Sequence, residues 1–167
     1  SGHVRTTFRS SGVAGTATIR ARSGAADDAT TEVSIADAET LKIGHINETY
    51  SATYDQGGMR VRYIHQKINK GVFKNPVAVM KNVMRVTTHI RRKLEAAGAR
   101  DITRRSLIVI PTRDGQSHYV GRDGEFWRTF VFVEGVQTFE AVQSPDQAYQ
   151  AGRAFGEFQS LLVDLPD

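Results

Sequence analysis

The sequence contains no cysteine and only 4 prolines in 167 residues. Without cysteine there are no disulfides and no thiolate metal sites, which fits a reducing, cytoplasmic location. No apolar run approaches the roughly 18 residues of a membrane-spanning helix, and no signal-peptide pattern opens the chain. The five histidines are scattered without the spacing of metal ligands. We therefore expect a cytoplasmic protein with no metal site and no membrane partner.

Acidic residues are scarce in one stretch of the chain. The net charge is +4, but residues 60–105 carry thirteen Lys and Arg against only Glu95 and Asp101. Such a segment is typical of a surface that meets nucleic acid or polyphosphate, or of a solvated helix face balanced by the rest of its domain. Because no nucleic-acid motif and no aromatic stacking surface accompany it, nucleic acid is the less favoured partner.

The composition changes near residue 38. Residues 1–38 are rich in Ser, Thr, Ala and Gly, and "GTATIRA" and "TTEVSI" alternate as the strands of a hairpin do. Larger apolar residues in a mixed α/β pattern follow. This predicts two domains, residues 1–38 and residues 39–167.

The second region begins with a predicted hairpin and a helix. "YSATYD" and "MRVRYIHQKI" flank Gly57 and Gly58, and glycine permits the positive φ of a tight turn. Asn75 is a good helix cap, Pro76 suits the first turn, and Gly98 suits the end. Apolar residues recur at helical spacing between them, which predicts an amphipathic helix that covers a sheet.

Further strands and a second helix are expected after this helix. "SLIVIPT", residues 106–112, indicates a buried strand, and two Asp-Gly turns at residues 114–115 and 123–124 bracket a short strand before "WRTFVFV". Ser144 followed by Pro145 and Gln147 predicts a capped helix through Leu162. Phe155 and Phe158 fit its buried face.

These elements predict an α+β fold. The expected sheet is antiparallel and five-stranded, with one long covering helix, a C-terminal helix and a preceding β-hairpin segment.

Several short sequence segments, in this order, resemble the N-terminal lobe of N-acetylhexosamine kinases, which belong to the aminoglycoside phosphotransferase, or protein-kinase-like, superfamily. The resemblance covers residues 42–167. The matching words are "GHINETY", "YIHQKIN", "VFKNPVAVMKNVMRVTTHI", "VIPTRDG", "WRTFVFVEG" and "AGRAFGEFQSLL".

The resemblance implies a nucleotide site with ATP and Mg²⁺ as its ligands. "GHINETY" corresponds to the family's phosphate-covering loop, Gln66 to its phosphate-binding lysine, and "VEG" to the hinge that meets adenine. Lys67, the neighbour of Gln66, should point to the opposite face of the strand. The implied nucleotide-binding residues are Gly44, His45, Asn47, Thr49, Gln66, Glu134 and Val136.

The sequence also departs from the family. The family's first strand is replaced by "DAETLKI", and the long helix offers only Glu95 for an ion pair with the sheet. No catalytic-loop aspartate with its asparagine is present, and a catalytic lobe is not expected before Asp167, so no catalytic residue is assigned. We therefore expect no phosphoryl transfer from this chain alone.

Residues 1–38 resemble, more weakly, the last strands of a bacterial immunoglobulin-like repeat of the adhesin type. A missing first strand would leave an unpaired sheet edge, and residues 16–22 and 31–36 are expected to extend the sheet there. The exposed edge and inter-lobe surface predict a homo-oligomer. The alternative function is thus a non-enzymatic, self-associating module of a chimeric or truncated chain, with no retained ligand.

Overall fold

A computed structural model describes residues 33–41, 46–56, 58–139 and 141–166. They separate into two compact units. The sheet unit contains the described residues through Lys74 together with Ile110–Phe132, and the helical unit contains Asn75–Val109 and the described residues from Val133 onward. The expected packing of the long helix on the sheet would join these two units, and it stays a prediction.

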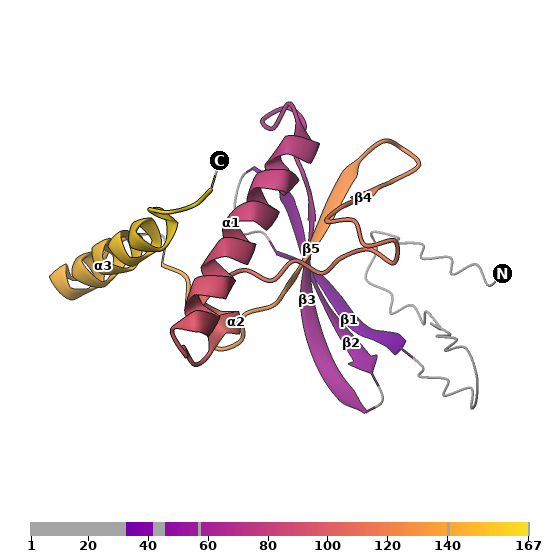
Figure 1. Cartoon of the computed structure of the whole chain (residues 1–167). Coiled ribbons are helices and arrows are strands. Elements are labelled where there is room, and N and C mark those ends of the chain that lie inside the picture. Colours follow the sequence, from indigo (N-terminus) through magenta and orange to yellow (C-terminus); the bar gives the residue numbers. More distant parts are fainter. Residues whose placement is uncertain (1–32, 42–45, 57, 140, 167) are drawn as a thin grey trace, which may run out of the picture. The chain divides into compact units, whose positions relative to one another are not determined.

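The sheet unit is built on one antiparallel sheet with the strand order β1-β2-β3-β5-β4 (Figure 1). The strands are β1 (Val33–Leu41), β2 (Glu48–Gln56), β3 (Met59–Lys67), β4 (Tyr119–Val120) and β5 (Phe126–Val131). The predicted α+β class with a five-stranded antiparallel sheet is confirmed.

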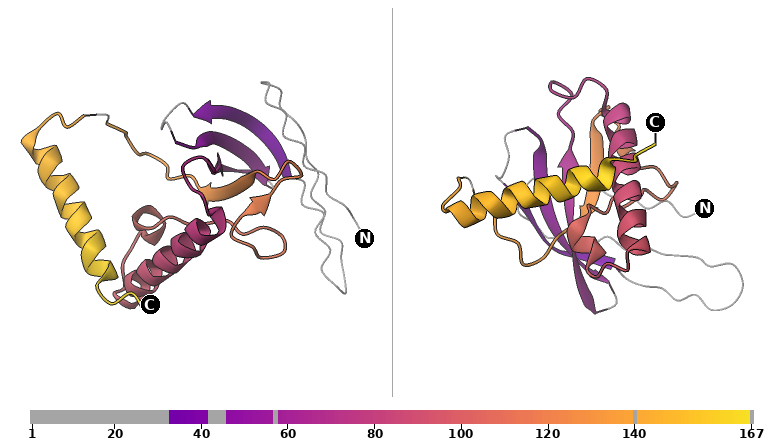
Figure 2. Two further views of the ribbon diagram at one scale, coloured as in Figure 1. Left: turned by 90° about the horizontal axis from the view of Figure 1, so that it is seen from above. Right: turned by 60° about the vertical axis from the view of Figure 1, so that its left-hand side comes forward.

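Strand β1 corrects the expectation of an unpaired edge beside β2. Its register with β2 runs from Val33 opposite Gln56 to Leu41 opposite Thr49, with one shift between Ile35 and Asp37, and the two strands lie side by side in Figure 2. Residues 33–35 of the predicted extension therefore do pair with β2, whereas residues 16–22 lie outside the described part. The predicted boundary at residue 38 falls inside β1. The segment contains Asp, Glu and Ala, which are depleted in strands. Its composition therefore did not indicate that it would form a strand paired with β2.

The predicted hairpin over β2 and β3 is confirmed. The two strands pair from Glu48 opposite Lys67 to Gln56 opposite Met59. Gly58 adopts φ +82°, the left-handed region that favours glycine, and its N–H donates to the Asp55 carboxylate at 3.0 Å. Lys67 and Gln66 consequently lie on opposite faces of β3, as expected.

The predicted strand at residues 106–112 is wrong. Within this stretch only Val109 forms an isolated β-bridge. The N–H of the next residue, Ile110, donates to the carbonyl of Thr129 in β5 at 2.9 Å. Pro111 follows directly and has no N–H to donate, so a regular ladder cannot continue. The fifth strand of the sheet is β1 instead.

The helical unit contains both predicted helices and one short helix that was not predicted. The elements are α1 (Pro76–Ala96), α2 (Ile102–Arg105) and α3 (Pro145–Leu162). The Asn75 carboxamide oxygen accepts from the N–H of Ala78 at 3.0 Å, and the Ser144 hydroxyl accepts from the N–H of Gln147 at 3.2 Å. Both predicted caps are confirmed.

The C-terminal end of α3 is attached to α1. The ammonium of Lys93 lies 2.5 Å from the Asp164 carboxylate, and Nε2 of His89 lies 3.0 Å from the Leu161 carbonyl and 3.2 Å from Asp164. The Lys93 contact lowers the pKa of Asp164. These contacts hold the two helices together where α3 ends.

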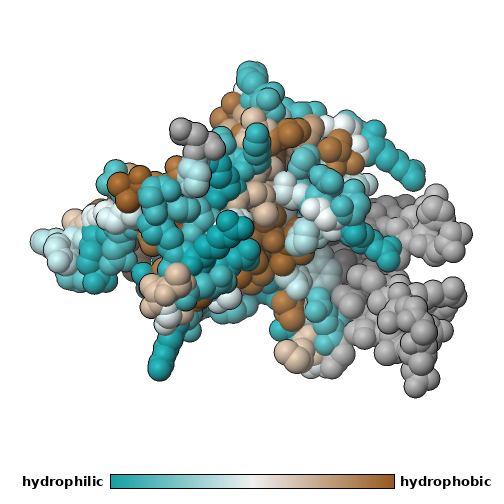
Figure 3. Space-filling view, viewed as in Figure 1, coloured by the Kyte–Doolittle hydropathy of each residue, from teal (hydrophilic) through white to brown (hydrophobic). Residues whose placement is uncertain are grey.

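The rest of α3 is exposed, which corrects the expectation for its aromatic residues. Phe155 and Phe158 are 62% and 42% exposed, and their rings stack on each other with centroids 6.5 Å apart. Hydrophobic side chains are visible at the surface of α3 in Figure 3. The helical period correctly grouped these residues on one face, but it does not determine whether that face is covered.

Candidate functional site

Three polar side chains form a continuous row across the sheet. Thr49 of β2, Gln66 of β3 and Arg128 of β5 occupy directly opposite register positions. The Gln66 amide nitrogen donates to the Thr49 hydroxyl at 3.1 Å, and Nε of Arg128 donates to the Gln66 amide oxygen at 3.0 Å. We call these three residues the polar row.

The polar row carries a partly desolvated positive charge. Burial lowers the pKa of Arg128, but a guanidinium remains protonated at any physiological pH. The central carbon of its guanidinium, Cζ, lies 5.1 Å from the centre of the Phe130 ring, and Phe130 is buried. A cation held beside an apolar ring and a neutral amide attracts an anion more strongly than a fully hydrated cation does.

Arg128 is the site residue that the sequence analysis missed. Phe126, Arg128 and Phe130 alternate along β5 and therefore share one face of the strand. An arginine at the middle position of such an apolar series is unusual, because an arginine is rarely buried without a partner. This unusual position was the signal in the sequence that could have identified Arg128 as a candidate site residue.

Asn47, at the entrance to β2, has a structural role in the sheet unit. Its side-chain oxygen accepts from the N–H of Asn69 at 3.0 Å, and the Asn69 side chain accepts from the N–H of Gly71 at 2.8 Å. The Thr49 hydroxyl lies 3.5 Å from the Asn47 carbonyl. These contacts tie the start of β2 to the turn that follows β3.

The predicted nucleotide-binding residues are thus brought together only in part. Asn47, Thr49 and Gln66 are neighbours in the sheet unit, whereas Gly44 and His45 lie outside the described residues. Glu134 and Val136 belong to the helical unit and are exposed. The carbonyl of Glu134 accepts a hydrogen bond from Arg104.

The opposite face of the same strands has a charged hollow of about 280 Å³. Two ion pairs line it, Lys67 with Glu48 and Lys70 with Glu125, the second at 2.7 Å. The hydrogen bond from Lys67 lowers the pKa of Glu48, and the same contact raises the pKa of Lys67. Each ammonium of the hollow therefore already has a carboxylate partner.

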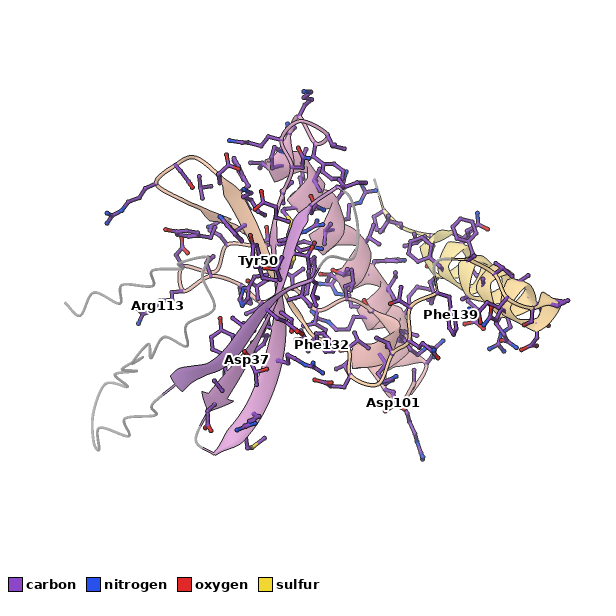
Figure 4. The ribbon with its side chains drawn as sticks, turned by 180° about the vertical axis from the view of Figure 1, so that it is seen from behind. Asp37, Tyr50, Asp101, Arg113, Phe132 and Phe139 are labelled. Atoms are coloured by element: carbon purple, nitrogen blue, oxygen red, sulfur yellow. The ribbon has the colours of Figure 1, made fainter. Side chains whose placement is uncertain are left out.

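Aromatic side chains and one histidine share the face of this hollow. The rings of Tyr50, labelled in Figure 4, and Trp127 have centroids 5.9 Å apart. His65 lies 2.9 Å from the Tyr54 hydroxyl through Nε2 and 2.9 Å from the Thr129 hydroxyl through Nδ1. Burial lowers the pKa of His65 to about 4, so the imidazole is neutral at physiological pH. It therefore adds no positive charge to the sheet.

A second guanidinium, that of Arg62, packs on the ring of Phe132, the residue that follows β5. The Arg62 guanidinium carbon lies 3.8 Å from the centre of the Phe132 ring, which is labelled in Figure 4. The N–H of Phe132 donates to the Arg62 carbonyl at 3.1 Å. Arginine stacked on phenylalanine therefore recurs on β3 and β5 and helps to position both strands.

The described residues contain neither a metal-binding cluster nor a membrane-spanning helix. That part of the chain contains no group of three or more His, Asp or Glu residues able to hold a metal ion. None of its helices combines the length and the apolar character needed to cross a membrane. A scan against known protein-family models finds no family that matches this chain.

Proposed function

We propose that this chain is the nucleotide-binding part of a phosphotransferase related to the hexosamine kinases, and that it binds the phosphates of ATP. The proposal is restricted to binding. No residue in the chain is assigned to phosphoryl transfer.

The polar row is the observation that carries the proposal. Gln66, the residue that corresponds to the family's phosphate-binding lysine, accepts a hydrogen bond from Arg128. Arg128 thus supplies on the neighbouring strand the positive charge that Gln66 lacks. A guanidinium suits this role because its planar array of N–H donors matches the oxygens of a phosphate.

The topology around the row gives further support. Residues 42–47 connect β1 to β2, and β1 and β2 are antiparallel neighbours. A phosphate-covering loop between the first two strands is what the resemblance implies. The strand that the sequence analysis considered missing, β1, occupies that position in the chain.

Titration of the protein with ATP and Mg²⁺ in a calorimeter tests this function. We expect saturable binding of ATP, and we expect Arg128→Gln to weaken it roughly ten-fold to a hundred-fold, because a hydrogen bond to a charged group contributes about 1.5–3 kcal/mol. Adenosine has no phosphates, so its affinity should be the same for both proteins. Thermal unfolding of each variant verifies that it is folded.

Arg122→Gln is the matched control, since Arg122 is an exposed loop residue of the same unit. It changes the net charge by the same amount and should leave ATP binding unchanged. Absence of binding heat in the unmodified protein, or equal losses in Arg122→Gln and Arg128→Gln, would reject a phosphate site at the polar row.

One observation favours the alternative function, a self-associating module without a ligand. We propose that the exposed aromatic residues of α3, Tyr149, Phe155 and Phe158, would then meet a second molecule. Light scattering over a range of concentrations tests this. A concentration-dependent mass that Phe155→Gln reduces, together with no response to ATP, would favour the alternative, and a strict monomer would reject it.

A further inference from the structure

The basic residues of this protein are concentrated in the first part of the helical unit. Residues Asn75–Val109, which include α1 and α2, contain eight Lys and Arg but only two acidic residues, Glu95 and Asp101. About half of the charge excess of residues 60–105, +6 of +11, therefore belongs to this part of the helical unit. In the view of Figure 3, hydrophilic side chains lie over α1.

Three of these cations form one stripe along α1. Lys81, Arg85 and Arg92 are all exposed, and their spacing confines them to an arc of about 40° on a helix with 3.6 residues per turn. We call these three residues the basic stripe. The buried residues of the same helix project from roughly the opposite side: they are Pro76, Met80, Ile90 and Leu94.

Carboxylates pair with several other cations of the unit but not with the basic stripe. Lys93 is paired with Asp164 at 2.5 Å, Arg91 lies 4.0 Å from Glu95, and Arg105 lies 3.8 Å from Glu157. Within the described residues, neither Lys81 nor Arg92 takes part in an ion pair.

Arg85, the middle residue of the stripe, keeps its charge as well. Its guanidinium donates to the carbonyl of Pro166, which is a neutral acceptor. The stripe is therefore a line of uncompensated positive charge. Its length along the helix axis, from Lys81 to Arg92, is about 16 Å at 1.5 Å per residue.

From this arrangement we propose that the basic stripe binds the phosphate backbone of duplex nucleic acid without reading its sequence. A duplex has about one negative charge per 1.7 Å of its axis, so a straight line of cations meets phosphates along its whole length. This binding surface is separate from the proposed nucleotide site, because the stripe belongs to the helical unit and the polar row belongs to the sheet unit.

Other polyanions fit the stripe less well. Single strands are held largely by bases stacked on aromatic rings, and α1 contains no Phe, Tyr or Trp. A helix that lies on an anionic membrane inserts an apolar face, but Met80, Ile90 and Leu94, on the side of α1 opposite the stripe, are already buried in the protein. Phosphate contact alone requires neither feature.

The number of cations in the stripe predicts how binding depends on salt. Each phosphate that is neutralised releases counterions, so three contacts give a slope of log K against log salt of about −2.7. Binding should be weak, in the range of non-specific complexes, and should be strongest at low salt.

Fluorescence anisotropy of a short labelled DNA duplex, measured over a series of salt concentrations, tests the proposal. The double variant Lys81→Gln, Arg92→Gln should reduce the steepness of the slope by about 1.8, since each lost contact removes about 0.9. The matched control is Arg91→Gln, Arg153→Gln. Both of its residues are exposed and each is 4.0 Å or less from a glutamate in its own helix.

The two double variants have the same net charge, so they separate the position of the charge from its amount. A reduced slope in the stripe variant, with little change in the control, supports the proposal. Equal reductions in both variants would mean that total charge alone drives binding, and would overturn it. The proposal is equally overturned by no binding at low salt, by tighter binding of a single strand, or by binding to phosphatidylserine vesicles in preference to the duplex.

Discussion

His65 should make the stability of the sheet unit depend on pH in the acid range. Its half-buried imidazole lies against the hydroxyls of Tyr54 and Thr129, and this burial lowers its pKa to about 4. Burial also raises the pKa of Tyr54, so Tyr54 stays neutral in acid. The protonation of His65 is therefore the charge change at this position.

The sign and size of the effect follow from the two pKa values. An unfolded histidine has a pKa of about 6.5, so between pH 6.5 and pH 4 the unfolded chain binds a proton that the folded chain does not. Stability is fully present above pH 6.5 and falls as the pH decreases through this window. The steepest slope is about 1.4 kcal/mol per pH unit, and the total loss is about 3 kcal/mol.

Urea unfolding at constant ionic strength, repeated between neutral pH and pH 4, measures this loss. The variant His65→Gln keeps a hydrogen-bonding side chain but does not titrate, so it serves as the reference. The free energy of unfolding of the unmodified protein should fall with acid by about 3 kcal/mol more than that of the variant. The subtraction removes the contributions of the other titrating groups.

An NMR titration of the histidine ring protons gives an independent result. His65 should remain neutral until about pH 4. If His65 titrates near pH 6.5, or if the unmodified protein and His65→Gln lose stability in parallel, then burial of this imidazole does not suppress its protonation and the reasoning is refuted.

Two further predictions concern backbone conformation and capping. Gly124→Ala should lower the free energy of unfolding by about 1 kcal/mol, because φ at this residue is +76°, which an L side chain rarely adopts. Gly152→Ala should raise the free energy of unfolding by about 1 kcal/mol, because Gly152 lies inside a helix with open space for a methyl group. Chemical denaturation of both variants measures the opposite signs. Asn75→Ala should cost about 1 kcal/mol through loss of the cap of α1, while Asn82→Ala, at an exposed position inside the same helix, should not destabilise the protein, and thermal unfolding compares the two.

Local signals in the sequence were sufficient for the two long helices, α1 and α3, and for the turns. Asn75 with Pro76, and Ser144 with Pro145, marked the starts of α1 and α3 correctly, and the Asp-Gly pairs marked turns at Gly115 and Gly124. These features depend on hydrogen bonds and φ values within a few residues, which the local sequence specifies. The short helix α2 was missed because it is only four residues long and lacks a side-chain cap.

The candidate site was predictable only in part, for a related reason. Thr49 and Gln66 were identified through the resemblance, and the hairpin that joins them is local. Arg128 lies 62 residues beyond Gln66 in the chain. Its role depends on β3 pairing with β5 in one particular register, and a register shifted by one residue would put Arg128 on the other face.

The sequence by itself determined the two long helices with their N-terminal caps, the β2–β3 hairpin, the glycine turns and the α+β class. Only the tertiary structure decided that β1 pairs with the edge of β2 and that residues 106–112 make a single bridge instead of a strand. It also decided that Phe155 and Phe158 are exposed, and which polar groups meet in one row. The physical reason is that strand pairing and burial are set by partners distant in the chain. A segment's own composition cannot specify which partner supplies its hydrogen bonds or covers its apolar face.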